Sequence, residues 1–391
     1  MSDSADKYAV AKADRQSFVD KVLNSQSRKK IVVAGPGTGK TTLFKDVLKG
    51  KRNSLTLTFV NSLVEDLTLE LNGLSKVRTL HAFARDVIRR ANGSARVFPN
   101  LSSIIKDDAS VLEGKTIDFD ELFYNRDDNN ENIPFYKKRK DYYGHYGFCD
   151  IIFAAARYLE VHPEKIPAFD QVVVDEFQDF NMLEVSLIDL LAKTSPILLA
   201  GDDDQALYYF KKASPIHIRQ RFSDGHPEYD AFTLPYCSRC TRVIVDAFND
   251  VVRFAIRSGF LQDRIEKSYI FYDDKDKDAD CGKYPTLVHA QGCFPTQISF
   301  FIAKQISELA EERRQRFSVL VIAPTKRRCR RLAKSLRKKG FKNVTFVESE
   351  GSKEPQLLDG LKILIEDKKS NLGWRIVLKF LMSESELRPL L

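Results

Sequence analysis

Two short segments carry residues whose types and spacing could handle phosphate. Residues 35–42 read GPGTGKTT and directly follow the apolar run IVVA at 31–34. Residues 175–179 read DEFQD and follow the run QVVV at 171–174. A glycine-rich loop between a strand and a helix can wrap its N–H groups around phosphates, and carboxylates at the end of a strand can hold a cation and a water. Together they predict that the chain binds and hydrolyses a nucleoside triphosphate.

The first segment offers backbone donors and two reactive side chains. The Lys40 ammonium would reach the terminal phosphates, and the Thr41 hydroxyl would coordinate Mg²⁺. The helix that follows, to about residue 49, adds unpaired N–H groups and the positive end of its dipole. The predicted nucleotide-binding residues of this loop are Gly35, Pro36, Gly37, Thr38, Gly39, Lys40, Thr41 and Thr42.

Two further strand ends carry polar side chains for the same crevice. Asp175 fits the Mg²⁺ contact, directly or through water, and Glu176 fits the base that polarises the attacking water. The apolar run 197–200 leads into GDDDQ at 201–205, where the Gln205 amide could sense the terminal phosphate. A solvated acidic turn is the alternative for this third segment taken alone.

Composition limits the class of protein. The 391 residues have room for two or three domains, and 43% hydrophobic with 30% charged residues is typical of a soluble globular chain. No apolar run approaches the roughly 20 residues that span a bilayer, and the polar start MSDSADKYAV is not a secretory signal. We therefore expect a cytoplasmic protein without a membrane partner.

The distribution of charge favours an anionic partner. The net charge is +8, and residues 313–342 hold 13 Lys or Arg with no Asp or Glu. Contact with a phosphate backbone explains this run best, with a solvated helix face or a surface for an acidic domain as alternatives. The six cysteines form no disulfide framework, and the lone pair Cys237 and Cys240 does not by itself predict a zinc or redox site.

The motifs now stand in an order that resembles the UvrD/Rep-like superfamily 1 helicases. The resemblance covers most of the chain. Its matching segments are Gln16 upstream of the phosphate loop, TFVN at 58–61, TLHAF at 79–83, DEFQD at 175–179, GDDDQALY at 201–208 and LPYCSRCTRVI at 234–244.

The resemblance implies ATP with Mg²⁺ in a cleft between two RecA-like domains. Gln16 would read the adenine, and Arg239 would join the catalytic residues by contacting the terminal phosphate. The catalytic residues expected from this reading are Lys40, Asp175, Glu176, Gln205 and Arg239. Family members often have Tyr directly before this Arg, whereas Ser238 stands here and Tyr236 lies two residues earlier. The residue that stacks on the adenine therefore stays open.

The same resemblance implies contacts with single-stranded DNA, with or without a duplex junction. The expected DNA-binding residues are Phe59, Asn61, His81, Phe83, Phe210 and Lys211. Phe210 is the strongest of them because it lies in the run YYFKK, where aromatic rings stand next to lysines, as suits a nucleic-acid groove. Core packing is an equal alternative for Phe59 and Phe83, and a structural hydrogen bond is the favoured alternative for His81.

The expected organisation is an α/β P-loop NTPase in three parts. Residues 1–270 would form a RecA-like parallel sheet with a helical insertion at about 85–165, and residues 271–284 a charged linker. Residues 285–391 would form a partial second RecA-like domain, with strands at 286–290, 319–323 and near 344–347. Two late family motifs have no counterpart, so we expect a fragment, a naturally short gene, or one part of a split protein completed by a partner chain.

We expect an ATP-dependent DNA helicase or translocase that moves 3′ to 5′ on single-stranded DNA. The alternative is an ATP- and DNA-binding regulatory or split-protein module without unwinding activity. A motor acting on RNA is a weaker reading, because nothing in the sequence reads a 2′-hydroxyl.

Overall fold

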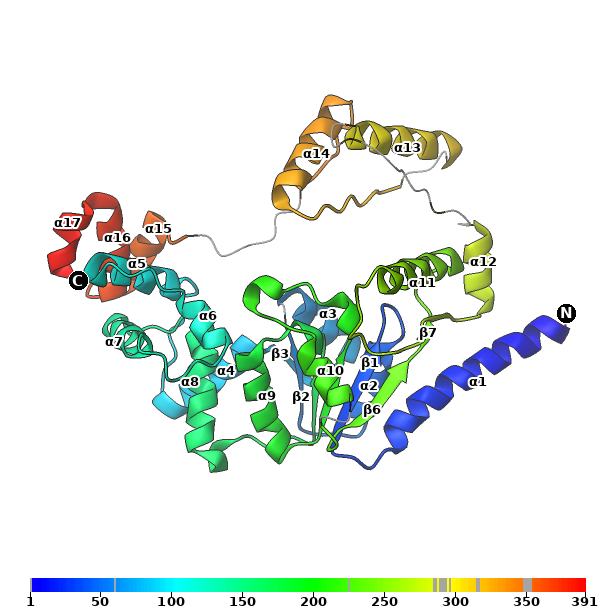
Figure 1. The fold of residues 1–391 in the computed structure, drawn as a ribbon, viewed down its shortest axis with the longest axis horizontal. Helices are drawn as coiled ribbons and strands as arrows, with labels where there is room; N and C mark the ends of the chain where they lie inside the picture. The colour runs from blue at the N-terminus through cyan, green and yellow to red at the C-terminus, as the bar shows by residue number, and fades with distance from the viewer. Residues whose placement is uncertain are drawn as a thin grey trace. The chain divides into compact units, whose positions relative to one another are not determined.

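The computed structural model describes residues 2–59, 61–223, 226–283, 287, 294, 297–313, 317–346 and 354–391. The chain divides into two compact units (Figure 1). The first unit contains Met1–Pro285 together with Glu354–Leu391, and the second contains Thr286–Lys353. Each unit is described by itself.

A six-stranded sheet forms the centre of the first unit. Its strand order is β3-β2-β4-β5-β1-β6, and every neighbouring pair is parallel. The predicted α/β fold with a parallel sheet is therefore confirmed. The strands are β1 (Lys29–Ala34), β2 (Ser54–Thr58), β3 (Lys76–Thr79), β4 (Gln171–Val174), β5 (Ile197–Gly201) and β6 (Asp230–Leu234).

Both faces of this sheet are covered, because alternate residues of each strand enter two different cores. In β1, for example, Ile31 and Val33 belong to one apolar cluster and Val32 and Ala34 to the other. Side chains of successive strand residues point to opposite faces, so continuous apolar runs are what a doubly covered parallel sheet requires. The carboxyl ends of all six strands consequently meet at one edge, where the predicted motifs begin.

Helices of the nucleotide-binding part flank the sheet. Val22 of α1, Leu43 of α2 and Leu71 of α3 pack in one of the two clusters. The helices are α1 (Ser2–Asn24), α2 (Lys40–Leu48), α3 (Asn61–Leu71), α9 (Met182–Thr194), α10 (Ile216–Phe222), α11 (Arg242–Arg257) and α12 (Lys275–Lys283). Two short parallel strands, β7 (Tyr236–Cys237) and β8 (Ile270–Phe271), join the segments on either side of α11.

The segment between β3 and β4 is helical, as predicted for the insertion. Thr79 caps the first of its helices, because its side chain accepts a hydrogen bond from the N–H of Ala82. The helices are α4 (Leu80–Asn92), α5 (Leu101–Glu113), α6 (Phe119–Tyr124), α7 (Ile133–Tyr143) and α8 (Phe148–Val161). Apolar residues from these helices continue the core on one face of the sheet.

The last three helices pack on this insertion. They are α15 (Leu357–Glu366), α16 (Asn371–Leu381) and α17 (Glu384–Leu387). Arg375 of α16 donates to Asp108 of α5 at 2.7 Å, and both side chains are buried. Arg139 of α7 donates to the other oxygen of Asp108 at 2.8 Å. The expected boundary of one domain over 285–391 therefore differs from the structure, which groups 354–391 with the first unit.

The second unit contains helices α13 (Ile298–Arg313) and α14 (Lys326–Lys338). The strand predicted at 319–323 is absent: these residues form no strand, and Leu320 and Ile322 are each 83% exposed. Residues 344–346 form no strand either. A buried parallel strand needs neighbouring strands to pair with, and none is present among the described residues of this unit. The strand predicted at 286–290 lies outside the described residues, apart from Leu287.

Among the residues that the structure describes, we find no helical segment with the length and apolarity required of a membrane span.

Candidate active site

The glycine-rich loop lies between β1 and α2, at the carboxyl edge of the sheet. Gly37 and Gly39 have φ angles of 72° and 95°, in the left-handed region that side chains disfavour. The loop is closed by the Thr38 hydroxyl, which donates to the carbonyl of Gly35 at 2.9 Å. Gly39 precedes the first residue of α2, so the free N–H groups of the helix start point toward the loop. Lys40 begins that helix.

The acidic motif follows β4 and faces the lysine of the loop. The Lys40 ammonium lies 3.5 Å from a carboxylate oxygen of Glu176. Glu176 has a φ angle of 53°, an uncommon conformation for a residue with a side chain. Burial and the neighbouring Glu176 charge raise the pKa of Asp175 to about 7, while Lys40 lowers it.

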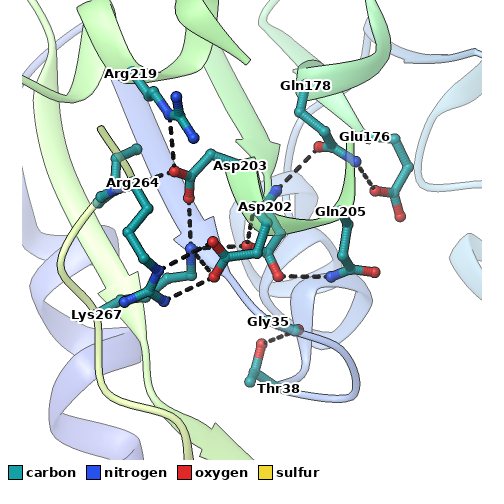
Figure 2. A network of polar contacts seen from close by, with 12 residues as sticks. Gly35, Thr38, Glu176, Gln178, Asp202, Asp203, Gln205, Arg219, Arg264 and Lys267 are labelled. Carbon is teal, nitrogen blue, oxygen red and sulfur yellow. Dashed lines mark hydrogen bonds and ion pairs between the residues drawn. The ribbon is translucent and has the colours of Figure 1, made fainter. Parts of the chain in front are cut away.

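A continuous series of hydrogen bonds links Glu176 to the third motif (Figure 2). The Gln178 amide nitrogen donates to Glu176 at 2.8 Å, and its carbonyl oxygen accepts from the N–H of Asp202 at 3.0 Å. The Gln205 amide then donates to the Asp202 carboxylate at 2.7 Å. Gln178 and Asp202 are 1% and 0% exposed, so the hydrogen bond between them, at the centre of this connection, is shielded from water. The structure thereby brings together Lys40, Glu176 and Gln205, which were predicted from three separate segments.

Three consecutive carboxylates of the third motif surround one buried ammonium group. The Lys267 nitrogen lies 2.9 Å from Asp202, 2.5 Å from Asp203 and 2.9 Å from Asp204. Two arginines complete the set, because Arg264 binds Asp204 and Arg219 binds Asp203. Sequence analysis missed all three cations. The basic residues near 264–267 carry no motif of their own that could have signalled this role.

The segment that carries Arg239 lies against the phosphate loop. The N–H of Ser238 donates to the carbonyl of Gly37 at 3.0 Å. A Cβ built on Gly37 would lie 2.5 Å from the Cβ of Arg239, so this approach requires glycine. Tyr269 reinforces the contact, because its hydroxyl donates to the carbonyl of Pro36 at 2.8 Å. Arg239 is thus placed beside the predicted phosphate site, with an exposed side chain.

The predicted adenine-reading residue, Gln16, lies on an exposed face of α1. Its amide donates to Asp20 of the same helix at 2.8 Å. The adjacent Arg15, by contrast, approaches the phosphate loop: its guanidinium comes within 2.8 Å of a Cβ built on Gly39. The same guanidinium lies over the ring of Tyr272, 5.0 Å from the ring centroid. Sequence analysis singled out neither Arg15 nor Tyr272.

Two of the predicted DNA-binding residues are packed in the core. Phe59 and Phe83 are 8% and 7% exposed, and both belong to the larger apolar cluster. The Phe59 ring packs against Phe180 and Tyr208, at centroid distances of 5.6 and 4.6 Å. Their direct contact with DNA stays a prediction, and the structure gives both rings a packing role.

The other predicted DNA-binding residues differ in their surroundings. Phe210 is 75% exposed and follows Gln205 by five residues. The Lys211 ammonium lies 4.8 Å from the centroid of the Phe59 ring. His81 packs edge-on against Phe148 at 4.5 Å, and burial, with the nearby Lys211 charge, lowers its pKa to about 3. His81 is therefore neutral near pH 7. Asn61 begins α3, and its side chain lies outside the described residues.

The residues of the site fit a magnesium–nucleotide complex. Two positive-φ glycines and a helix start form a cradle of N–H donors, and Lys40 supplies a cation at its edge. The Thr41 hydroxyl and the Asp175 carboxylate are hard oxygen ligands, of the kind that Mg²⁺ binds together with phosphate oxygens. Nothing in the donor set favours a softer metal.

Comparisons with known proteins agree with this geometry. The family model described as "UvrD/REP helicase N-terminal domain" matches residues 122–226. The ATP-dependent DNA helicase PcrA of Staphylococcus aureus is 25% identical over 280 residues, which covers 57% of this chain and 38% of the relative. PcrA of Staphylococcus epidermidis matches with the same identity and the same coverage. The chain is thus similar to less than half of the length of these relatives.

Fold and site together define a P-loop nucleotide-binding protein built on a RecA-like parallel sheet. Within that class the chain is similar to the UvrD/Rep-like helicases: the match to the family model over residues 122–226 and the similarity to PcrA confirm the resemblance that the ordered motifs predicted.

Proposed function

We propose that the protein hydrolyses ATP to drive its own movement along single-stranded DNA, in the 3′ to 5′ direction. The observation that carries this proposal is the series of hydrogen bonds from Glu176 through Gln178 and Asp202 to Gln205. It connects the catalytic carboxylate to the segment that ends in the exposed Phe210. A change at the terminal phosphate can thereby alter the surface that contacts DNA.

In this mechanism the chain's own residues bind and orient the reactants. Lys40 and the loop N–H groups hold the terminal phosphates, and Glu176 accepts a proton from the attacking water. Gln178 holds the Glu176 carboxylate in place through its amide. Arg239, beside Gly37, neutralises charge that develops on the transferred phosphoryl group. The magnesium ion, when bound by Thr41 and Asp175, would neutralise charge on the phosphate oxygens.

We also infer that Arg15 and Tyr272 take the place of the missing adenine-stacking tyrosine. The Arg15 guanidinium lies beside Gly39 and over the Tyr272 ring, 5.0 Å from the ring centroid. The Arg15 guanidinium would move away from the Tyr272 ring to admit a planar base, which needs about 3.5 Å on each side. Both groups then offer the base stacking or cation–π attraction. Gln16, one residue further along α1, could then turn from Asp20 to the edge of the base.

Two surfaces are proposed for DNA. The exposed Phe210 ring would stack on a base, which is worth roughly 1–3 kcal/mol and does not depend on sequence. In the second unit, eight of the thirteen residues of α14 are Lys or Arg and all eight are exposed. We propose that this helix contacts the phosphate backbone, so DNA binding should weaken steeply as salt is raised.

The proposed DNA contact is tested with a matched pair of aromatic variants. Phe210→Ala should weaken binding of a single-stranded oligonucleotide about 10-fold, corresponding to roughly 1.4 kcal/mol, and should reduce the stimulation of ATP hydrolysis by DNA. Phe260 is similarly exposed, at 67%, but lies far from the motifs in sequence, so Phe260→Ala should change neither quantity. Equal DNA affinity for both variants and the wild type would refute the role of Phe210.

The alternative is a module that binds ATP and DNA without unwinding. The two candidates differ in one measurable quantity, the rate of phosphate release from ATP. In the alternative module DNA would bind but would not raise this rate. Glu176→Gln provides the reference for that comparison, since it keeps the size of the side chain and removes the base.

A further inference from the structure

We propose that Lys267 is a positioning residue for ATP hydrolysis, acting as a built-in cation that holds the third motif in its catalytic arrangement. The inference rests on the proposed ATPase function and adds to it a residue from outside every motif. Lys267 would touch neither nucleotide nor DNA. It would act through Asp202, which in turn orients Gln205 and Gln178.

The first argument is the geometry of the ammonium group. Three carboxylates lie within 2.9 Å of the Lys267 nitrogen, which is as many as its three N–H bonds can serve. The side chain of Lys267 is 5% exposed, and those of Asp202 and Asp203 are fully buried. A divalent cation would suit the same three carboxylates, which lie close enough to share one. The lysine occupies that position instead.

The second argument is charge balance. Asp202, Asp203 and Asp204 bring three negative charges, and Lys267, Arg264 and Arg219 bring three positive charges. Burial alone would lower the pKa of Lys267, but Asp202 and Asp203 raise it above its ordinary value. The group is therefore charged near neutral pH. Without it, three adjacent buried carboxylates would face only the two arginines.

The third argument is what the cluster holds in place. One Asp202 oxygen accepts from the N–H of Asp204 at 3.1 Å, and the other accepts from the Gln205 amide at 2.7 Å. The N–H of Asp202 donates to Gln178, which reaches Glu176. The orientation of Asp202 thus determines the position of the Gln205 amide, which would sense the phosphate. It also determines the position of Gln178, which supports the Glu176 carboxylate. Displacing a catalytic group by about 1 Å can cost roughly 100-fold in rate.

The test compares Lys267→Met with Lys267→Arg and with the control Lys275→Met. Lys275 is an exposed lysine of α12. In steady-state ATP hydrolysis with single-stranded DNA, Lys267→Met should lower kcat roughly 10- to 100-fold, with the KM for ATP nearly unchanged. Lys267→Arg should recover part of kcat, and Lys275→Met should match the wild type. A normal kcat for Lys267→Met, or an equal loss in Lys267→Arg, would overturn the proposal.

A pH profile separates this role from simple structural support. The titratable and charged groups facing the site are Asp202, Asp203, Asp204, Lys267, Arg264 and Arg219. In Lys267→Met, protonation of one carboxyl replaces the lost positive charge. The deficit in kcat relative to the wild type should therefore shrink as the pH falls from 8 to 6. A deficit that is independent of pH contradicts the proposal.

Asp202→Asn keeps the test decisive should Lys267→Met fail to fold. This variant keeps the shape of the side chain and leaves Lys267 paired with Asp203 and Asp204, so it should fold. We expect reduced kcat with unchanged affinity for ATP, and wild-type turnover would overturn the proposal. A wild-type protein that hydrolyses no ATP would instead refute the proposed function itself, which makes the two failures distinguishable.

Discussion

The substitution Gly201→Ala should disconnect the catalytic carboxylate from the third motif without changing any charge. Gly201 ends β5, and a Cβ built there would lie 2.4 Å from Oε1 of the Gln178 side chain. It would also lie 3.0 Å from Ile218 and 3.1 Å from the backbone nitrogen of Phe177. Ordinary contacts between non-bonded heavy atoms are about 3.5–4.0 Å, so Gln178 must move by about 1 Å.

That displacement has two separable costs. Overpacking a tight site costs about 1–3 kcal/mol, and leaving the buried N–H of Asp202 without its acceptor costs about 1–3 kcal/mol more. If the two add, the free energy of unfolding falls by about 2–6 kcal/mol. The turnover of ATP should fall as well, by up to about 100-fold, because Glu176 loses the Gln178 amide that orients it.

Urea unfolding and steady-state ATP hydrolysis measure these two effects on the same preparation. Gly282→Ala is the matched control: Gly282 lies in α12, with open space where its Cβ would be. Because alanine is the better helix former, this control should be neutral or more stable by up to about 1 kcal/mol. Wild-type stability and turnover in Gly201→Ala would refute the reasoning that this glycine is required by Gln178.

Three further predictions concern other parts of the first unit. Arg375→Met should lower the free energy of unfolding by about 3–5 kcal/mol in urea, because it leaves Asp108 with an incomplete buried ion pair. Burial raises the pKa of Asp150 to about 7, so between the ordinary carboxyl pKa and about 7 the native form holds a proton that the unfolded chain has released, and stability falls as the pH rises through this window. Urea titrations at pH 5 and 7 should therefore show that Asp150→Asn gains up to about 1.4 kcal/mol per pH unit over the wild type between these two values, and an equal difference at both values would contradict this. Tyr272→Ala should raise the KM for ATP about 10-fold at nearly constant kcat, and an unchanged KM would exclude the stacking role.

The sequence predicts the sheet and the phosphate site well for a physical reason. Both depend on local patterns: apolar runs buried on two faces, each followed directly by glycines or carboxylates. The residues at the carboxyl ends of parallel strands must meet at one edge, so neighbouring motifs can be assembled without knowledge of the loops between them. Lys40, Glu176 and Gln205 were brought together in this way.

The contacts that sequence analysis missed link segments far apart in the chain. Lys267 reaches Asp203 across 64 positions, and Arg375 reaches Asp108 across 267. A lysine or arginine in a polar segment looks the same whether it ends in water or in a buried carboxylate cluster. The strand predicted at 319–323 was wrong for a different reason. Its apolar residues indicated a buried strand, but the described residues of this unit contain no strand with which it could pair.

The exposed fraction of the side chain distinguishes the three phenylalanines that were predicted to contact DNA. Phe59, Phe83 and Phe210 are the same residue type in similar motifs, and spacing could not distinguish them. In the structure the first two are 8% and 7% exposed, whereas Phe210 is 75% exposed. Phe210 is therefore the one of the three rings that a base could reach without rearrangement of the core.

The most direct test of the central claim is ATP hydrolysis with and without single-stranded DNA, measured for the wild type, Lys40→Ala and Lys45→Ala. Lys45 is exposed on the same helix as Lys40, so its removal controls for a general loss of charge. The account predicts strong stimulation by DNA in the wild type and in Lys45→Ala, and a loss of about 100-fold or more in Lys40→Ala. DNA binding without any stimulated hydrolysis in the wild type would contradict the claim that this chain couples ATP turnover to DNA.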